Sequence, residues 1–348
     1  MNLLRDPWLP VEAAEGFRHA TLKDVLCSDE GLKLKLGRDD MELAALQLAI
    51  CLTQVLLPPA DAADWRERVD KPLTEYPDEQ ATTATAKVSG WFDIRHESNP
   101  FMQSRGVKAK EPTPIQKLFA GLPAGANHAF FNPAGQTVAV CPSCAAIALF
   151  HQASNCPSFG GGFKGSLRGG APVTTLVAGE SLRRTIWLNV LHRQSAAKLG
   201  LPDDWGKPVW VDPIRRAQAI PVGTIGLLRG LFWQPARIEL VWQETNSTCA
   251  ECGEASRLTT GEFLAEKFSY ELGNEVAQWP HPHGARQWER KGEKDGAKRE
   301  SAVTFRRTAP AWTQLSGFLF EHEKKKEGWT PAAVLLLLRA LSSGRETV

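Results

Sequence analysis

Residues 141–170, CPSCAAIALFHQASNCPSFGGGFKGSLRGG, combine a Cys-Pro-Ser-Cys knuckle, an apolar run and a glycine-dense basic loop. The three consecutive glycines at positions 160–162 have no Cβ, so the backbone there can adopt a positive φ and approach another surface closely. Phenylalanines flank these glycines, and Lys164 and Arg168 add positive charge. A backbone suited to close approach, with cations beside it, favours nucleic acid over a plain flexible surface loop.

A second Cys-x-x-Cys pair, Cys249 and Cys252, repeats far downstream the spacing of Cys141 and Cys144. Two such pairs form a tetrathiolate Zn²⁺ site, because each pair supplies one edge of a tetrahedron with sulfurs about 2.3 Å from the metal. Four thiolates close the coordination shell, so the predicted zinc is structural and joins distant segments. The alternative is two unrelated pairs of buried thiols, and Cys156 is a substitute ligand to consider.

The composition is typical of an intracellular globular protein. With 348 residues, 43% of them hydrophobic, the chain can bury a large core. Seven cysteines, an odd number that includes two Cys-x-x-Cys pairs, indicate a reducing compartment rather than a disulfide framework. The N-terminus lacks a signal-peptide pattern, and polar side chains interrupt the apolar stretch 41–57, so we expect a cytoplasmic protein without a membrane span. The net charge is only +2, so nucleic-acid contacts must come from local basic patches.

The hydrophobic pattern predicts an α+β fold, as one large irregular domain with long loops. Helices are expected over residues 39–56, 61–69, 144–153 and 332–341. Residues 185–191 and 236–242 have the β-branched and aromatic content of strands. The charge-mixed stretch 286–307 is typical of a solvated hairpin or a mobile loop. Twenty-three prolines and twenty-nine glycines imply many turns between these elements.

Sequence signals for catalysis are weak. The glycine loop is neither a Walker loop nor a GxGxxG turn, and no G-x-S-x-G elbow occurs. A zinc deaminase needs a proline before its Cys-x-x-Cys pair, but Val140 precedes Cys141. His281 and His283 alternate with prolines, and we expect them to form a structural turn rather than a metal site. A metal-dependent hydrolase needs an open metal position, and four thiolate ligands argue against one.

A series of sequence blocks, spread in order over nearly the whole chain, is more specific than any of these single motifs. The blocks are WLPV at 8–11, RDDMELAAL at 38–46, NPFMQ at 99–103, CAAIALF at 144–150, FGGGFK at 159–164, LRGG at 167–170, LRGLFWQPA at 228–236, EKF at 266–268, WPHPH at 279–283 and APAWTQ at 309–314. Together they resemble the CasA family, the large subunit of the type I-E CRISPR surveillance complex, Cascade.

The resemblance implies a non-enzymatic subunit that acts with other Cascade subunits, a CRISPR guide RNA, target double-stranded DNA and the CRISPR helicase-nuclease. In that family the subunit inspects the protospacer-adjacent motif (PAM) from the minor groove and helps to start strand separation. Minor-groove acceptors hardly distinguish A·T from T·A, so a lysine donor beside a close-fitting backbone predicts relaxed motif choice. The expected DNA contacts are Gly160, Gly161, Gly162, Lys164, Arg168 and Lys267, the last as a lysine finger.

Two further expectations come from the resemblance. Phe130, Phe131 and Asn132 match the segment that docks the subunit onto the complex near the 5′ end of the guide RNA, and the four cysteines match the family's zinc site. A zinc-stapled scaffold that binds only RNA and partner subunits would keep both features but would not need the Lys267 contact.

The resemblance implies that the family's C-terminal part is missing from this sequence, so we expect a fragment, a minimal natural variant or one half of a split subunit. Family members continue for about half as many residues again, a further domain's length, through a glutamine-bearing hairpin and a helical bundle. The chain ends at Val348. The expectation is therefore one large N-terminal-type domain over residues 1–348, without the bundle and with weaker opening of the duplex.

Overall fold

The computed structural model describes residues 1–77, 88, 90–122, 135–169, 173–273 and 279–284, and the backbone of two strands at 286–290 and 298–302. Two predicted features lie outside the described residues. They are the docking segment Phe130, Phe131 and Asn132, and the helix over 332–341.

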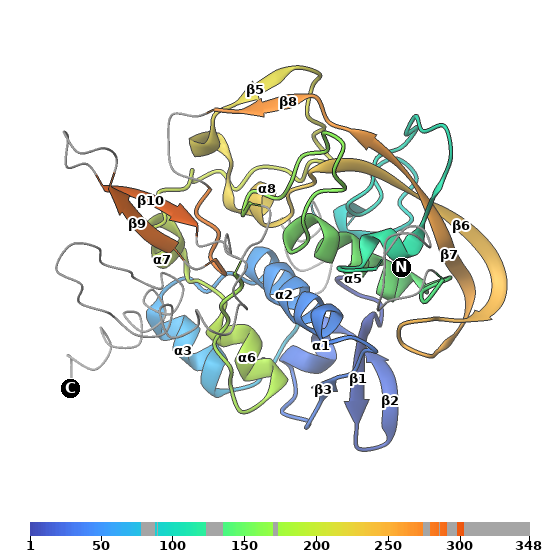
Figure 1. Ribbon diagram of the computed structural model, residues 1–348. Coiled ribbons are helices and arrows are strands. Elements are labelled where there is room, and N and C mark those ends of the chain that lie inside the picture. Colours follow the sequence, from blue (N-terminus) through green and yellow to red (C-terminus); the bar gives the residue numbers. More distant parts are fainter. Residues whose placement is uncertain are drawn as a thin grey trace.

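Helix α2 (Asp39–Leu56) forms the centre of the molecule and has the predicted bounds. It packs against α5 (Pro142–Ser154) and α6 (Leu182–Leu188), so nearly all of its sides are buried (Figure 1). The capping residue is Arg38, and its side chain makes no capping hydrogen bond. Three acidic side chains in the first turn favour the positive end of the helix dipole instead.

An N-terminal sheet covers one end of these helices. Strand β1 (Leu9–Ala13) pairs antiparallel with both β2 (Gly16–Ala20) and β3 (Lys33–Leu34). Helix α1 (Leu22–Leu26) follows β2 and begins with a capping box, in which Thr21 and Asp24 each bond the other's backbone N–H.

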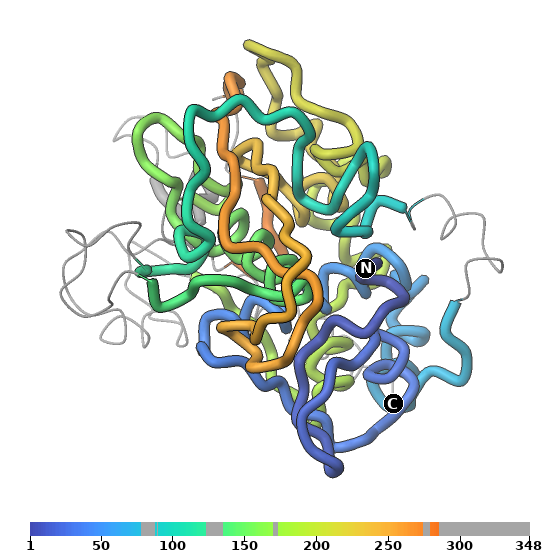
Figure 2. The backbone as a smooth tube through the Cα atoms, turned by 90° about the vertical axis from the view of Figure 1, so that its right-hand side faces the viewer, coloured from blue at the N-terminus to red at the C-terminus, as the bar shows by residue number. Residues whose placement is uncertain are grey.

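A long antiparallel hairpin runs along one face of the molecule (Figure 2). It consists of β6 (Ala236–Thr248) and β7 (Ala255–Lys267), and its first residue, Ala236, pairs with its last, Lys267. Side chains along the first part of β6 alternate between buried and half-buried, as in a strand with one face on the core. The sequence-predicted strand over 236–242 is therefore confirmed and extended. Strand β4 (Thr113–Pro114) adds to the β7 edge.

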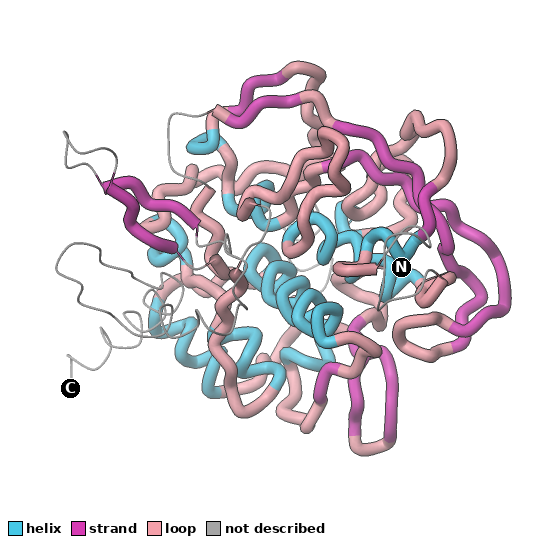
Figure 3. The backbone as a smooth tube through the Cα atoms, viewed as in Figure 1, coloured by secondary structure: helices cyan, strands magenta, loops and turns pink. Residues whose placement is uncertain are grey.

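Shorter elements complete the fold, with helices mostly inside and strands mostly outside (Figure 3). Strands β5 (Gln218–Ile220) and β8 (Tyr270–Leu272) pair in parallel. Strands β9 (Arg286–Arg290) and β10 (Lys298–Ala302) pair antiparallel, which agrees with the hairpin and not with the mobile loop as the two alternatives for that charged stretch. The remaining helices of the described residues are α3 (Ala62–Asp70), α7 (Arg193–Ala197), α8 (Leu227–Leu231), and the 3₁₀ turns Gly90–Phe92, Ile115–Leu118 and Val222–Thr224.

The strand predicted over 185–191 is wrong, because most of this stretch belongs to helix α6. Ser181 caps the helix by accepting a hydrogen bond from the N–H of Arg184 at 3.2 Å. Ile186 and Trp187 are fully buried, and α6 packs against α2 and α3. Burial against neighbouring helices thus overrides the β propensity of these side chains.

The α+β prediction is confirmed, since helices and strands both contribute and the four predicted cysteines lie together. No helix in the described ranges combines the length and the apolarity needed to cross a bilayer.

Candidate metal centre and nucleic-acid interface

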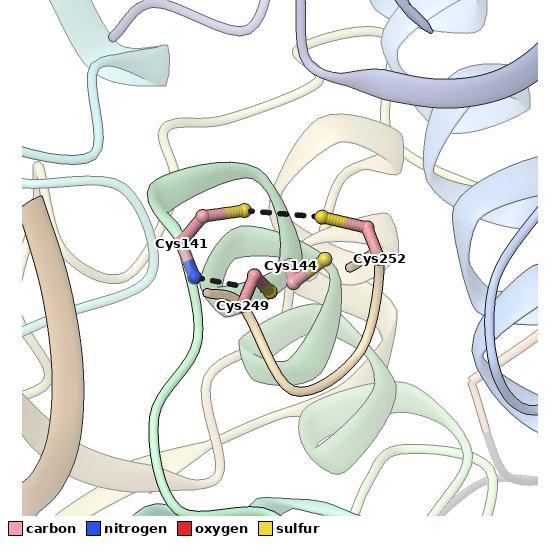
Figure 4. A group of neighbouring side chains, drawn as sticks. All are labelled: Cys141, Cys144, Cys249 and Cys252. Carbon is pink, nitrogen blue, oxygen red and sulfur yellow. Dashed lines mark hydrogen bonds between the residues drawn. The ribbon is translucent and has the colours of Figure 1, made fainter. Parts of the chain in front are cut away.

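The four cysteines of the two Cys-x-x-Cys pairs meet at one point (Figure 4). Cys141 is the N-cap of α5, with Pro142 directly after it, and Cys144 lies one turn further along the same face. Cys249 and Cys252 lie in the turn that joins β6 to β7. All four sulfurs lie within 4.8 Å of one another, so the predicted grouping is confirmed.

The distances between these sulfurs suit a metal ion. Four sulfurs at about 2.3 Å from a tetrahedral centre are separated by about 3.8 Å. The sulfurs of Cys141 and Cys252 lie 3.8 Å apart. The backbone N–H of Cys141 also donates to the sulfur of Cys249 at 3.3 Å, a contact that stabilises negative charge on sulfur. The donor set therefore fits a tetrahedral metal ion with four thiolate ligands.

The thiols of this cluster cannot all ionise independently. Hydrogen bonds from Cys141, and then from Cys144, lower the pKa of Cys249 to about 7 and hold the pKa of Cys252 well below its usual range. The hydrogen bond with Cys141, the other two thiols and burial raise the pKa of Cys144. Four negative sulfurs at this separation need a cation between them, which a metal ion would supply.

The other cysteines lie apart from this cluster. Cys156 is buried and burial raises the pKa of its thiol to about 12, while Cys51 is fully buried in the core. Cys27 is half-buried after α1. Cys156 therefore does not replace any of the four ligands.

Polar contacts that the sequence did not reveal connect the start of α2 to the cysteine cluster. The Gly37 N–H donates to the backbone oxygen of Glu251 at 3.2 Å, and a Cβ on Gly37 would lie 3.1 Å from that oxygen. Arg38 holds both carboxylate oxygens of Asp40 at 2.9 Å, and His151 of α5 lies 3.1 Å from the same carboxylate. Burial alone would raise the pKa of Asp40. The hydrogen bonds from His151 and Arg38 outweigh this effect and keep the pKa of Asp40 below its usual value.

The glycine loop follows α5 and is anchored on the β6–β7 hairpin. Its three glycines have φ values of +77°, +56° and +89°, which favour glycine over other residues. Phe159 packs edge-to-face against Phe163 and at a tilt against the fully buried Phe263 of β7, with ring centroids 5.4 and 5.7 Å apart. The aromatic residues beside the glycines thus fix the loop and leave its backbone exposed.

Lys267, the last residue of β7, lies directly against this loop. Its Nζ is 3.4 Å from the position that a Cβ on Gly162 would occupy, and 5.7 Å from the centroid of the Phe163 ring. Within the part of the chain that the structure describes, no atom lies within 4 Å of the corresponding positions on Gly160 and Gly161. The structure therefore brings the two predicted DNA-contacting elements together and leaves two glycines open. Lys164 is exposed nearby, with its Nζ 5.7 Å from the centroid of Tyr270.

Arg168 was also predicted to contact DNA, but the structure places it in the interior. Its side chain is 3% exposed and donates hydrogen bonds to Asn155 Oδ1, Thr174 Oγ1 and the carbonyl oxygens of Val173 and His283, at 2.9 to 3.3 Å. Burial lowers the pKa of its guanidinium to about 10. Arg168 holds the end of the glycine loop in place and cannot reach a duplex from there, so we remove it from the interface.

The chain is similar to known proteins in two ways, through a protein family that matches its sequence and through solved structures that share its fold. The family described as CRISPR-associated protein Cse1 matches residues 2–348. Similar solved structures include Cse1 from Acidimicrobium ferrooxidans (20% identity, TM-score 0.67), Thermobifida fusca Cse1 (20%, 0.68) and Thermus thermophilus CasA (17%, 0.61). These alignments cover 99%, 99% and 100% of this chain, but only 65%, 67% and 69% of those chains. The chain therefore spans about two thirds of their length, and at these identities the likeness is one of fold.

Proposed function

The chain belongs to the CRISPR-associated protein Cse1 family, and on that premise we propose that it is a non-catalytic subunit of an RNA-guided surveillance complex, Cascade. In this role it recognises the PAM of target double-stranded DNA from the minor groove and helps to start strand separation. A chain in a structure described as a CRISPR RNA-guided surveillance complex shares the fold, with a TM-score of 0.50. The observation that carries the proposal is the contact between Gly162 and Lys267.

The surface around this contact suits the DNA minor groove, whose hydrogen-bond acceptors hardly differ between A·T and T·A pairs. Open glycine backbone at positions 160 and 161 lets base edges and phosphates come close, since no side chain stands in the way. Lys267 makes no ion pair with a carboxylate within the described ranges, so its ammonium keeps donors for DNA. One lysine cannot distinguish A·T from T·A in the minor groove, so we expect relaxed motif choice.

The cysteine cluster has a structural role in this proposal. Four thiolates in a tetrahedron suit Zn²⁺, which would hold the β6–β7 turn on the first turn of α5. With four sulfur ligands the ion has no position for a substrate or an attacking water, so the site supports no hydrolytic step. Docking near the 5′ end of the guide RNA through Phe130, Phe131 and Asn132, and recruitment of the helicase-nuclease, remain predictions.

The proposal is tested with the complex reconstituted with and without this chain. Affinities are measured for two labelled duplexes, one with the motif beside the guide-matched sequence and one with that motif scrambled. We expect the complete complex to capture the motif-bearing duplex more tightly and the complex without the chain to lose that preference. If the preference persists without the chain, another subunit reads the motif and this chain is a scaffold.

A further inference from the structure

A cleft of about 660 Å³ adjoins Lys267 and is not used in the function proposed above. Its walls come from the loop at 98–105, the loop at 210–216 and the residues around the end of β7. Five cations and one carboxylate line it: Arg105, Arg215, Arg216, Arg237, Lys267 and Glu266. The net charge of the chain is only +2, so this concentration of cations is a local feature of the fold.

The parallel pairing of β5 and β8 brings two walls of the cleft together. Gln218 pairs with Tyr270, so the residues just before each strand lie at the same end of the pair. The N–H of Ala217 donates to the oxygen of Ser269 at 2.6 Å and fixes the two segments to each other. Ala217 has a φ of +56°, a conformation that costs a residue with a Cβ about 1 kcal/mol or more. The fold thus holds Arg215 and Arg216 facing the end of β7 at some cost in strain.

The cations of the cleft differ in how far the chain neutralises them. Arg237 pairs with Glu266 at 2.9 Å, and Arg105 lies 3.5 Å from Glu239. Arg215, Arg216 and Lys267 are exposed, and no carboxylate of the described residues lies within ion-pair distance of them. These three side chains therefore remain available to an anion from outside the chain.

We propose that this cleft binds the sugar-phosphate backbone of the DNA strand that passes Lys267. The inference rests on the proposed function, because Lys267 belongs both to the motif-reading surface and to the cleft. Guanidinium groups match phosphate oxygens with two parallel hydrogen bonds, and the cleft also offers hydroxyl and amide donors from Ser98 and Asn99. A strand held here would be anchored beside the motif without being read.

An acidic protein partner is a weaker explanation of the cleft. Protein interfaces depend on large apolar or aromatic side chains that fill pockets at the centre of the contact. The aromatic residues lining this cleft, Trp210 and Phe268, are only 3% and 8% exposed, so they offer little surface for such an anchor. Charge is what the cleft presents, and phosphates are the ligand that charge alone can hold.

The test compares the reconstituted complex carrying Arg215→Ala and Arg216→Ala with the parent. We expect weaker binding of the motif-bearing and scrambled duplexes by the same factor, because backbone contacts carry no sequence information. Two lost phosphate contacts should reduce the salt slope of log affinity by about 1.8. Between about 50 and about 200 mM salt the parent should then lose about 12-fold more affinity than the variant. As a control, Arg66→Ala in the distant α3 with Lys71→Ala just after that helix, both at exposed positions, should match the parent (Figure 1).

The outcomes separate this inference from the proposed function. A parent complex without motif preference contradicts the proposed function, whatever the variant does. If the parent shows that preference and the variant has the parent's affinity and salt slope, only the proposal that the cleft binds the DNA backbone is contradicted. The same proposal is contradicted if the variant changes the ratio of the affinities for the motif-bearing and scrambled duplexes. It is also contradicted if the variant assembles poorly while each assembled complex binds DNA normally. The last result would identify an acidic subunit as the ligand.

Discussion

Helix α5 and the loop that follows it meet the β6–β7 hairpin in two places. The two places differ in whether their polar groups stay exposed to a ligand. At the start of α5, Cys141 and Cys144 meet the cysteines of the hairpin turn, and three of the four side chains are no more than 5% exposed. Beyond the end of α5, the glycine loop meets Lys267 at the other end of β7, where all three glycines and the lysine are exposed. We call the first, buried contact the closed contact and the second, exposed contact the open contact.

This difference separates residues that hold the fold from residues that recognise a ligand. At the closed contact the sulfurs face one another, and a metal ion would complete their set of partners inside the fold. At the open contact the phenylalanines anchor the loop, and the backbone and the ammonium keep their hydrogen-bonding capacity for a ligand. Changes at the closed contact should therefore lower stability, and changes at the open contact should lower DNA binding without unfolding the chain.

The largest effect is expected from breaking the closed contact with Cys249→Ser. Loss of one sulfur ligand should release the metal and lower the free energy of unfolding by about 4 kcal/mol or more. For a chain of 348 residues that is a fall in Tm of about 5 °C or more. Metal content by elemental analysis and Tm by calorimetry check it, with Cys27→Ser, outside the cluster, as the control. A protein without metal, or a variant as stable as the parent, would refute the structural role.

The second effect concerns the open contact and is produced by Gly161→Asp. A negative side chain at this exposed position should repel phosphates and weaken duplex capture by about 2 kcal/mol or more, roughly 30-fold. The change should leave the fold intact, because no atom of the described residues lies within 4 Å of the new Cβ. Gly200→Asp is a matched control, since Gly200 is also exposed, has φ +71° and has equally open surroundings. Equal binding by both variants would remove the glycine loop from the interface.

A smaller effect is expected from Lys267→Ala, which removes one cationic donor from the same surface. Duplex affinity should fall by about 1–3 kcal/mol, and the preference for the motif should weaken. Band-shift affinities on motif-bearing and scrambled duplexes measure both changes. An unchanged preference would assign Lys267 to the phosphate backbone alone.

The smallest effect is a pH dependence of stability at the base of the glycine loop. Burial, and then the charge of Arg168, lower the pKa of His283 to about 3. A histidine with a lowered folded-state pKa contributes stability that is present above its unfolded value of about 6.5 and is lost as the pH falls towards 3. Between about pH 7 and pH 5 this loss is about 1–2 kcal/mol. His283→Gln should show a Tm that falls less over this range than that of the parent, and an identical fall would contradict the assignment.

Much of the fold could be predicted where local signals decide it. Asp61 caps α3 by accepting hydrogen bonds from the N–H groups of Ala63 and Asp64, and the apolar run after the first cysteine pair indicates α5, which begins two residues before its predicted start at 144. Both helices were therefore expected close to their true bounds. Helix α6 was missed, because Ile186 and Trp187 read as strand residues until their burial against two helices is known. Long-range packing of this kind leaves no periodic signal in a short segment.

The candidate site was predictable to a similar extent. The Cys-x-x-Cys spacing alone indicated the metal cluster, whereas Lys267 was singled out only through the family resemblance. Charge in the sequence does not tell whether an arginine is exposed. Arg168 and Arg183 are both buried, and Arg183 bonds the carboxylate of Asp29 at 2.6 Å and three backbone oxygens. Their burial depends on carbonyl oxygens from several segments, which only the fold brings together.

The measurement that tests the central claim most directly is a double-mutant cycle on Gly162→Ala and Lys267→Ala in the reconstituted complex. The measured quantity is the ratio of affinities for motif-bearing and scrambled duplexes. Gly162 has a φ of +89°, which a residue with a Cβ rarely adopts, and its new Cβ would touch the Lys267 ammonium at 3.4 Å. The change should therefore shift the loop relative to the lysine and reduce the ratio much as the loss of the lysine does. We predict that the double variant is no less selective than the less selective single variant, because the two residues form one reading element. Independent, additive losses, or no loss in either single variant, would contradict the account.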